Sequence, residues 1–422
     1  MPERRGEWYE VKYWLTMVDG LPSLRHFLVW TGYCSRLGID YGNQRKAFNR
    51  MAIKPPSRRK FLVHAAKAAA LGLSGTVAMS QPSAFATPRS AISDSKSIAT
   101  IIPYGAAVRG DMLMSDKSYH DAVIAHCQLI VPESELKWSE LRPTRSEYRF
   151  EKADAMMDFA RKNNIELRGH TLAWYGAMPN WTAEIADRRE AERELATHIE
   201  TVVSRYRGRI RSWDVVNEPL ADWPSNAKSF RPSVWAKQLG PDYLAIAFRA
   251  AAAADPAARL VLNEYDVEFK GPRFAARRWA LIQLLRSLRD RDVPLHAVGL
   301  QAHLFAERAI DRDGLQSMLA EIASLKLDVL VTELDVIDYE LPGTISERDA
   351  LVASKAGLFL DTVGEVIRPK AILTWGLSDR YTWVPIYFKR VDGMANRPLP
   401  FDADLKPKPF FDTIENFRRK TA

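Results

Sequence analysis

Eight short apolar runs, rich in β-branched residues, lie between residue 98 and the end of the chain and alternate with amphipathic segments. The runs are residues 101–108, 129–132, 166–174, 212–217, 259–263, 297–301, 328–332 and 371–376. The amphipathic segments between them include residues 152–163, 188–205, 243–254 and 273–290. Strands that alternate with helices form right-handed βαβ units and a parallel sheet. Eight such units in about 320 residues predict an α/β fold, a (β/α)8 TIM barrel.

A doubly wound open sheet is the main alternative, because it also alternates strands with helices. Its nucleotide-binding members carry a Gly-x-Gly-x-x-Gly turn after the first strand. No such turn follows residues 101–108. The sequence therefore favours the closed barrel.

Polar or aromatic residues stand at the end of nearly every run. They are Glu133, His170, Trp174, Asn217, Glu218, Asn263, Glu264, Gln301, His303, Glu333, Asp335 and Trp375. In a barrel the carboxyl ends of the strands meet at one rim, where active sites are built. Polar residues scattered through a core would not gather at strand ends in this way. The pattern therefore predicts an enzyme.

Two of these residues, Glu218 and Glu333, end the fourth and the seventh run. A barrel places strands four and seven across its mouth from each other. Two carboxyl groups that face each other over a cleft suit the cleavage of a glycosidic bond. One must be protonated to donate to the leaving oxygen, and the other must be ionised to attack the anomeric carbon. We therefore expect their neighbours to push the two pKa values apart.

Ordered motifs from residue 104 to about residue 410 resemble glycoside hydrolase family 10, the xylanase family built on a (β/α)8 barrel. The matching segments are YGAAV at 104–108, PESELKW at 132–138, RGHTLAW at 168–174, WDVVNE at 213–218, LNEY at 262–265, GLQAH at 299–303, TELD at 332–335 and TWGLSD at 374–379, followed by Thr382 and Trp383. The LNEY segment matches more loosely than the others. The resemblance covers nearly the whole chain after residue 98.

The resemblance implies roles for individual residues. Glu218 resembles the acid/base and Glu333 the nucleophile, and Asn217 resembles the residue that holds the 2-hydroxyl of the sugar at subsite −1. His303, oriented by Asp335, resembles the hydrogen-bond partner of the nucleophile. Further residues resemble the sugar contacts and the aromatic lid over them: Glu133, Lys137, His170, Trp174, Gln301, Trp375 and Trp383.

Two positions depart from the family pattern. The family usually has Asn where this chain has Ser134, and His where this chain has Tyr175. Ser offers a shorter side chain with a hydroxyl in place of an amide, so one sugar contact at subsite −2 would be lost or bridged by water. Tyr is bulkier than His and does not carry a positive charge. We expect both changes to affect glycone binding more than the chemistry.

The first 86 residues differ from the rest in charge and pattern. They hold 13 Lys and Arg against 5 Asp and Glu, whereas the remainder holds 47 of each, so the net charge of +8 belongs to this leader. Ser57-Arg58-Arg59-Lys60-Phe61-Leu62, a weakly apolar stretch and Ala84-Phe85-Ala86 follow the order of an export signal. The arginine pair resembles a twin-arginine signal. The stretch is too short for a stable membrane anchor.

These features predict four segments: residues 1–50 as an upstream mis-start or an unassigned extension, 51–86 as the signal, 87–97 as a linker, and 98–422 as the hydrolase domain. We expect export to the periplasm or the outside by the twin-arginine machinery. The balanced charge of the domain does not favour nucleic acid as a partner. We expect a monomer.

The sequence thus predicts a retaining endo-1,4-β-xylanase that acts on a polysaccharide. The alternatives are a family enzyme for a related β-glycan, xylan fragments or aryl β-glycosides, and a carbohydrate-binding protein that has lost catalysis. No metal or other cofactor is expected, because the mechanism needs none and the histidines lack a spacing such as His-Glu-x-x-His.

Overall fold

The structure is a computed structural model that describes residues 101–226 and 228–420. Eight parallel strands form the closed barrel: β1 (Tyr104–Val108), β2 (Leu129–Pro132), β3 (Glu166–Ala173), β4 (Ile210–Asn217), β5 (Arg259–Glu264), β6 (Ala297–Leu300), β8 (Asp328–Ile337) and β9 (Ile372–Thr374). Neighbours in this order pair with each other, and β9 pairs with β1 to complete the circle. The predicted fold is confirmed.

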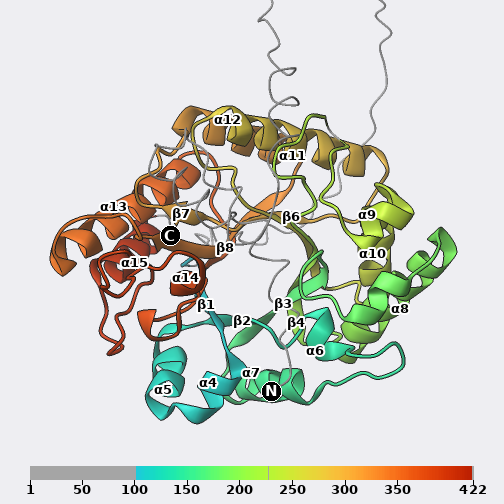
Figure 1. Ribbon diagram of the computed structural model, residues 1–422, viewed down its shortest axis with the longest axis horizontal. Helices are drawn as coiled ribbons and strands as arrows, with labels where there is room; N and C mark the ends of the chain where they lie inside the picture. Colours follow the sequence, from blue (N-terminus) through green and yellow to red (C-terminus); the bar gives the residue numbers. More distant parts are fainter. Residues whose placement is uncertain (1–100, 227, 421–422) are drawn as a thin grey trace, which may run out of the picture. The chain divides into compact units, whose positions relative to one another are not determined.

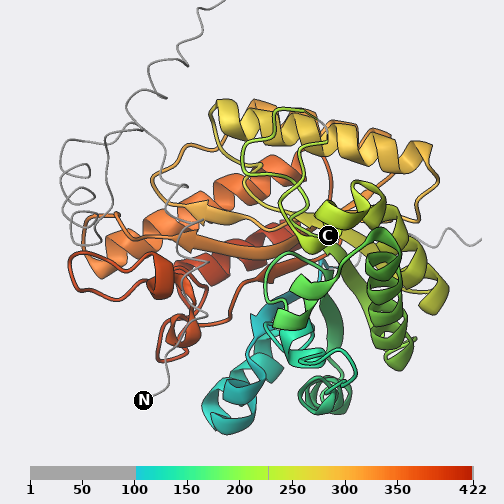
Figure 2. The same cartoon turned by 45° about the vertical axis from the view of Figure 1, so that its right-hand side comes forward.

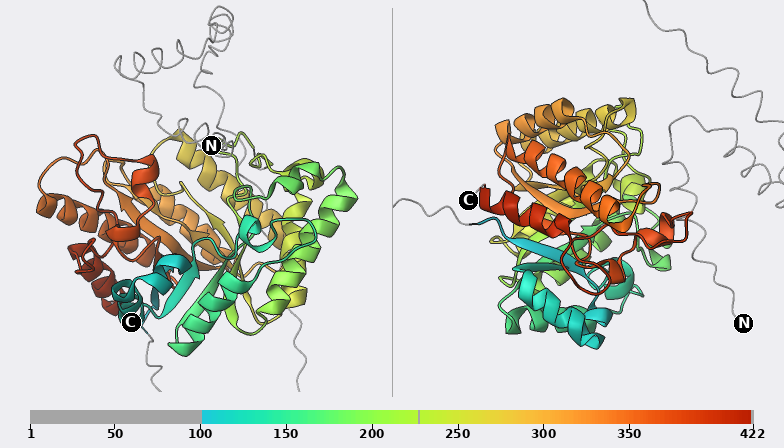
Figure 3. Two further views of the ribbon diagram at one scale, coloured as in Figure 1. Left: turned by 60° about the horizontal axis from the view of Figure 1, so that its bottom comes forward. Right: turned by 90° about the vertical axis from the view of Figure 1, so that its left-hand side faces the viewer.

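The helices form an outer ring around the strands, as Figures 1 and 2 show. The longer ones are α5 (Lys117–His126), α7 (Glu151–Lys162), α8 (Arg188–Arg205), α10 (Asp242–Ala254), α11 (Pro272–Asp290), α12 (Arg312–Ser324), α13 (Ile345–Gly364) and α15 (Pro409–Lys420). The shorter ones are α4 (Gly110–Ser115), α6 (Trp138–Leu141), η2 (Asn180–Glu184), α9 (Val234–Leu239), η3 (Asp379–Tyr381) and α14 (Val384–Tyr387). The last helix, α15, lies beside α13 (Figure 3) and so covers the strands where the barrel closes.

One strand lies outside the sequence prediction. β7 (His303–Phe305) follows β6 after a break at Gln301 and Ala302, and it pairs in parallel with the extended upper part of β8. His303 stands opposite Asp335 in this pairing. The predicted seventh run stopped at residue 332, but β8 continues to Ile337 because β7 supplies a partner for its additional residues.

Apolar side chains fill the inside of the barrel. A buried cluster joins residues from six strands, β9 among them, and the residue directly before β9: Ala107, Leu129, Val131, Val261, Ala297, Leu330, Ala371 and Leu373. Trp375 packs against this cluster from the carboxyl side. Alternation along a strand turns every second side chain inward, so a barrel of eight strands is closed by its own side chains rather than left as a pore. The inside of the barrel therefore has no room for a substrate, and the active site is expected at the rim formed by the carboxyl ends of the strands.

The loop after β9 is tied to the start of α5 by Asp116. This carboxylate caps α5 by accepting hydrogen bonds from the backbone of Ser118 (3.0 Å) and Tyr119 (3.1 Å). It also accepts from the Tyr381 hydroxyl at 2.8 Å and from Arg380 at 2.7 Å. One side chain thus serves as helix cap and as an anchor for the segment that carries Trp383.

Within the described residues, no helix combines the length and the apolar composition needed to cross a membrane. The predicted export signal, the linker up to residue 97 and the segment 1–50 lie outside the described residues.

Candidate active site

The fourth strand ends at Asn217, and the next residue, Glu218, has an unusual backbone conformation. Its φ is 52°, in the left-handed region that non-glycine residues seldom adopt. The Glu218 amide donates to the Asn263 carbonyl oxygen of β5 at 2.9 Å, which holds the turn in place. Pro219 follows directly. Strained backbone of this kind persists where the surroundings fix it, and here it presents a carboxyl group at the rim.

Glu333 lies on β8 and is 4 % exposed. One carboxylate oxygen accepts a hydrogen bond from the Asn263 amide at 2.6 Å, and the other faces His303 Nε2 at 3.2 Å. The other ring nitrogen of His303 lies 3.0 Å from Asp335, whose second oxygen accepts from Trp383 Nε1 at 2.8 Å. Glu333, His303, Asp335 and Trp383 therefore form a continuous hydrogen-bonded chain.

The positive charge of His303 and the negative charges of Glu333 and Asp335 stabilise one another. Burial opposes the charge of His303, but Asp335 and Glu333 raise the pKa of the imidazole well above its usual value. Burial likewise opposes the charge of Glu333, yet the hydrogen bond from His303 and the charge of His170 leave the pKa of this carboxyl below its ordinary value. Glu333 is therefore ionised, as a nucleophile must be.

Glu218 has neutral hydrogen-bond donors instead. Its Oε1 accepts from the Gln301 amide at 3.0 Å and from the Asn217 amide at 3.1 Å. The Asn217 oxygen in turn accepts from Asn263 Nδ2 at 2.8 Å, the same nitrogen that contacts Glu333. Two asparagine side chains therefore link the two carboxyl groups. Glu333 has a cationic neighbour in His303 besides its amide donor, whereas the hydrogen-bond donors to Glu218 are amides.

A buried ion pair supports the third strand. Arg168 forms a salt bridge with Asp214 of β4, and His170 Nδ1 lies 2.9 Å from the same carboxylate. All three side chains are almost completely buried. Ligand atoms of His170, Asp214 and Glu333 lie within 4.8 Å of one another, so this group could hold a metal ion among the described residues. Asp214 and Glu333 already have cationic or amide partners, which leaves little donor capacity for an ion.

The expected sugar-contact residues gather around the two carboxyl groups. Lys137 Nζ lies 4.9 Å from the centre of the Trp174 ring, and the His170 ring meets Trp375 edge to face at 5.2 Å. The His303 ring contacts Trp383 at 5.3 Å. Burial raises the pKa of Glu133, while Lys137 and Arg109 oppose that shift. Aromatic faces beside ion pairs and amides suit a pyranose, which presents C–H faces and hydroxyl edges.

Two residues at the site were given no role by the sequence, and a third, Tyr175, has a neighbour that the sequence did not indicate. Asn263 stood among the strand-end residues without a role, yet it contacts both Asn217 and Glu333. Asp214 lies inside a recognised motif and holds Arg168 and His170. The Tyr175 ring lies 4.5 Å from the Arg231 guanidinium carbon, and Tyr175 and Glu218 line the same small pocket; its expected effect on glycone binding stays a prediction. The position of Asn263 at a strand end was the only available signal among these.

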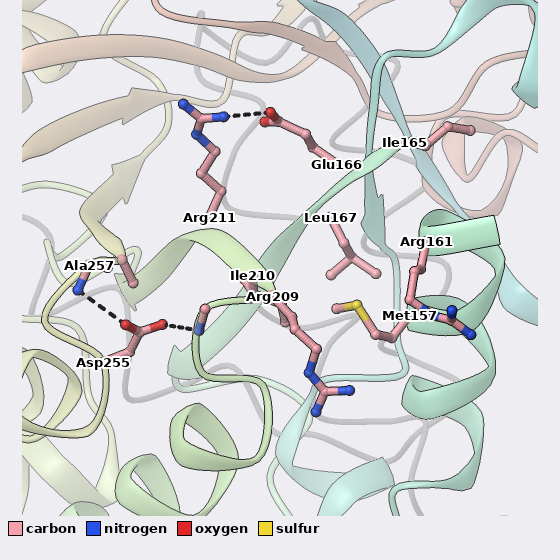
Figure 4. Close-up of a pocket in the computed structure, with 12 residues that line it drawn as sticks. Met157, Arg161, Ile165, Glu166, Leu167, Arg209, Ile210, Arg211, Asp255 and Ala257 are labelled. Atoms are coloured by element: carbon pink, nitrogen blue, oxygen red, sulfur yellow. Dashed lines mark hydrogen bonds and ion pairs between the residues drawn. The ribbon is translucent and has the colours of Figure 1, made fainter. Parts of the chain in front are cut away.

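A separate hollow lies at the opposite end of the barrel. It has a volume of about 470 Å³ and is lined by the first residues of β3 and β4, with Met157 and Arg161 of α7 (Figure 4). Glu166 and Arg211 form an ion pair there at 2.7 Å. None of the candidate active-site residues lines this hollow. The amino-terminal face of such barrels serves stability, so the rim remains the candidate active site.

Comparison with known proteins agrees with this geometry. Residues 93–417 match the family model described as glycosyl hydrolase family 10. The chain is 34 % identical over 330 residues to endo-1,4-beta-xylanase B of Paenibacillus barcinonensis, which covers 75 % of this chain and 96 % of that protein. It is 31 % identical over 310 residues to endo-1,4-beta-xylanase B of Thermotoga neapolitana, covering 71 % and 82 %.

A solved structure shows the same fold. Xylanase 10B from Thermotoga petrophila RKU-1, determined in complex with xylobiose, superimposes with a TM-score of 0.69 at 32 % sequence identity. The match covers 76 % of this chain and 94 % of that one. The rim with its two carboxyl groups, the barrel and the family model thus agree, and the chain is a glycoside hydrolase that belongs to glycosyl hydrolase family 10.

Proposed function

We propose that the chain is a retaining endo-1,4-β-xylanase that hydrolyses internal β-1,4 bonds of xylan, with Glu333 as nucleophile and Glu218 as acid/base. The single observation that carries the assignment of roles is the contrast between the two carboxyl surroundings. Glu333 faces the cationic His303 at 3.2 Å, whereas Glu218 Oε1 accepts hydrogen bonds from the neutral side-chain amides of Gln301 and Asn217. The names of the related proteins support xylan as substrate.

The reaction proceeds by double displacement. A Glu333 oxygen attacks C1 of the sugar at subsite −1, the C1–O bond to the leaving chain breaks, and Glu218 transfers its proton to the leaving oxygen. Water then attacks C1 of the glycosyl-enzyme and gives a proton to Glu218, while Glu333 departs as a carboxylate. Both groups return to their starting protonation states. His303 compensates the Glu333 charge in the free enzyme and after the second step.

The remaining site residues would bind the sugars. Trp174 lies beside Lys137 and His170, the Trp375 ring meets the rings of both His170 and His303, and Trp383 lies against His303. Asn217, Gln301 and Glu133 offer polar groups to hydroxyls at the same rim. We assign these residues to the −1 and −2 sugars on the strength of their proximity to Glu333 and of the family motifs.

The test is the release of reducing sugar from soluble xylan, mixed-linkage β-glucan and carboxymethylcellulose, with Glu333→Gln as the matched control. Release from xylan alone, lost in the control, is the expected result, and a proton NMR time course should show β-xylose ends before mutarotation. Release mainly from another β-glycan would retain the mechanism and refute the substrate. Activity that survives Glu333→Gln would refute the assignment of the nucleophile.

We also propose that the protein is made as a precursor, exported through the twin-arginine route and cut after Ala86. The Arg58-Arg59 pair, the apolar stretch and the Ala84-Phe85-Ala86 segment support this. Replacing Arg58 and Arg59 by Lys should retain the uncut precursor in the cytoplasm of a bacterial host. Amino-terminal sequencing of that precursor would decide the start: a first residue at Met51 supports the mis-start, and peptides from residues 1–50 refute it.

A further inference from the structure

The turn that follows β4 carries Glu218 in a left-handed backbone conformation, with a φ of 52°. Backbone groups of other segments hold its first two residues. The Glu218 amide donates to the Asn263 carbonyl oxygen at 2.9 Å, and the Arg231 amide donates to the Pro219 carbonyl oxygen at 2.8 Å. A backbone conformation of this kind persists only where the surrounding structure fixes it on both sides. The question is therefore what holds the chain just after Pro219.

Side chains hold the next two residues of the turn. The Leu220 amide donates to Glu264 Oε2 at 3.1 Å, and the Ala221 carbonyl oxygen accepts from Arg277 Nη1 at 2.7 Å. Glu264 is the last residue of β5, and Arg277 lies on α11. The two side chains also contact each other, because Arg277 Nη2 donates to Glu264 Oε1 at 2.5 Å. One ion pair thus binds an amide and a carbonyl group of adjacent residues in the turn.

The Glu264–Arg277 ion pair is rigid. Both side chains are completely buried, with 0 % exposure. Glu264 Oε1 also accepts from the Tyr265 amide at 3.1 Å, and Arg277 Nε donates to the Tyr265 carbonyl oxygen at 3.1 Å. The guanidinium carbon lies 4.3 Å from the centre of the Tyr265 ring. A planar guanidinium presents its donors in a fixed fork, so these contacts leave it one orientation. The pair therefore connects β5, α11 and the turn without slack.

The charge of the pair is costly to bury. Burial raises the pKa of Glu264 to about 7, and the Arg277 guanidinium opposes this rise. Glu218 and Arg231 also act on this carboxyl, the first raising its pKa and the second lowering it. Buried ion pairs can often be replaced by apolar residues without loss of stability, so such a pair is weak evidence for a stabilising role. Its two hydrogen bonds to the turn indicate a role in placing Glu218.

We propose that Glu264 and Arg277 are positioning residues for proton transfer: they hold the backbone of the turn so that the Glu218 carboxyl faces the leaving oxygen. This inference rests on the proposed role of Glu218 as acid/base. In the first step Glu218 passes its proton to the leaving oxygen as the C1–O bond breaks. In the second step it takes a proton from the water that attacks C1. Neither Glu264 nor Arg277 exchanges a proton in either step.

Two variants weaken this hold in different ways. Glu264→Gln replaces one of two accepting oxygens by an amide nitrogen, so at least one of the three donors to this side chain loses its acceptor. Arg277→Lys keeps the charge of the buried pair. A compact ammonium cannot, however, replace the guanidinium fork that reaches Ala221, Tyr265 and Glu264 at once. Arg277→Lys therefore tests the turn even where Glu264→Gln fails to fold.

The matched control is Glu194→Gln, which makes the same change in another buried ion pair. Glu194 lies on α8 and accepts from Arg142 at 2.8 Å, with the two side chains 8 % and 6 % exposed. It also contacts Arg145 and Arg193, which lie outside the acid/base turn. Thermal unfolding gives the folded fraction of each variant, and rates are expressed per folded molecule.

The assay separates proton transfer from the rest of the reaction by using two aryl β-xylobiosides. Dinitrophenolate leaves without protonation, whereas phenolate needs the acid, so the ratio of the two kcat/KM values reports on proton donation by Glu218. The second step is measured as kcat on the dinitrophenyl substrate with and without sodium azide. Azide attacks C1 of the glycosyl-enzyme and releases Glu333 without losing a proton, so it needs no general base.

In Glu264→Gln, kcat/KM on the phenyl substrate should fall roughly ten- to a hundredfold, because a displaced carboxyl donates its proton poorly. On the dinitrophenyl substrate kcat/KM should change by less than about threefold. The dinitrophenyl kcat should fall because water is activated less well, and azide should restore most of it. Arg277→Lys should show the same pattern with smaller losses. Glu194→Gln should match the wild type on both substrates, with and without azide.

Equal losses on both substrates, with no recovery in azide, would overturn the proposal and leave the ion pair with a packing role only. Folded Glu264→Gln and Arg277→Lys variants that are indistinguishable from the wild type would overturn it too. The proposed function fails in a different way: the wild type would then hydrolyse neither xylobioside, or Glu218→Ala would leave the phenyl activity intact.

Discussion

Gly299 lies on β6 and contributes to the site by having no side chain, because the Asn263 side chain occupies the space that a Cβ would fill. A Cβ at this position would lie 2.1 Å from Asn263 Oδ1 and 2.9 Å from Thr332 Cγ2. Asn263 Oδ1 already accepts from the Thr332 hydroxyl at 2.7 Å, and Asn263 Nδ2 donates to Glu333 at 2.6 Å. A carbon needs about 3.3 Å from an oxygen, so Gly299→Ala must push the Asn263 amide away by roughly 1 Å.

That displacement has two consequences whose sizes can be worked out. Overpacking in a close-packed barrel costs about 1–3 kcal/mol, and weakening the charge-assisted bond to Glu333 costs about 1.5–3 kcal/mol more. We therefore expect Gly299→Ala to lower the free energy of unfolding by about 2.5–6 kcal/mol. A nucleophile misplaced by a fraction of an ångström to 1 Å should lose about a hundredfold in kcat.

Denaturant unfolding and kcat per folded molecule on dinitrophenyl xylobioside measure the two effects separately. Gly105→Ala is the control, because its Cβ would meet the Leu129 carbonyl oxygen at 2.0 Å in the β1–β2 pairing, outside the Asn263 network. It should lose stability while folded molecules keep kcat within about twofold. If Gly299→Ala kept both wild-type stability and wild-type kcat, the argument that this glycine makes room for Asn263 would be wrong.

Three more outcomes follow from the same contacts. His303→Gln removes the cationic partner of Glu333, so that burial raises the pKa of this carboxyl with less opposition. The acid limb of kcat/KM against pH should therefore move to higher pH. An unmoved limb would contradict the role of His303. Asp214→Asn leaves the buried Arg168 without a carboxylate and should cost about 3–5 kcal/mol in urea unfolding, whereas Glu166→Gln at the exposed pair with Arg211 should cost less than about 1 kcal/mol. Trp383→Phe keeps an aromatic ring over the site but loses the hydrogen bond to Asp335 at 2.8 Å. The KM for xylan oligomers should rise several-fold, with a smaller change in kcat. A selective loss of kcat would argue against a sugar-binding role.

The fold could be predicted from the sequence because its signals are local. An apolar run rich in β-branched residues predicts a strand, and apolar residues repeating with the period of a helix predict a helix. Neither signal depends on which other elements the segment contacts. The strand-end position of Glu218 and Glu333 was equally visible, because in a parallel barrel every strand end faces the same rim. The residues flanking them, Gln301, His303 and Asp335, followed from the same pattern and from the family motifs.

Tertiary structure alone decided which of these side chains meet. Asn263 reaches Glu333 across 70 positions of sequence, and Arg168 reaches Asp214 across 46, because barrel closure and strand register bring their strands together. β7 exists as a strand only because β8 extends far enough to pair with it. The sequence indicated Tyr175 only as a bulky substitution, whereas the loop after β4 places the Arg231 guanidinium 4.5 Å from the centre of its ring. Composition and periodicity carry no information on such contacts, since they depend on where the closed barrel places each loop.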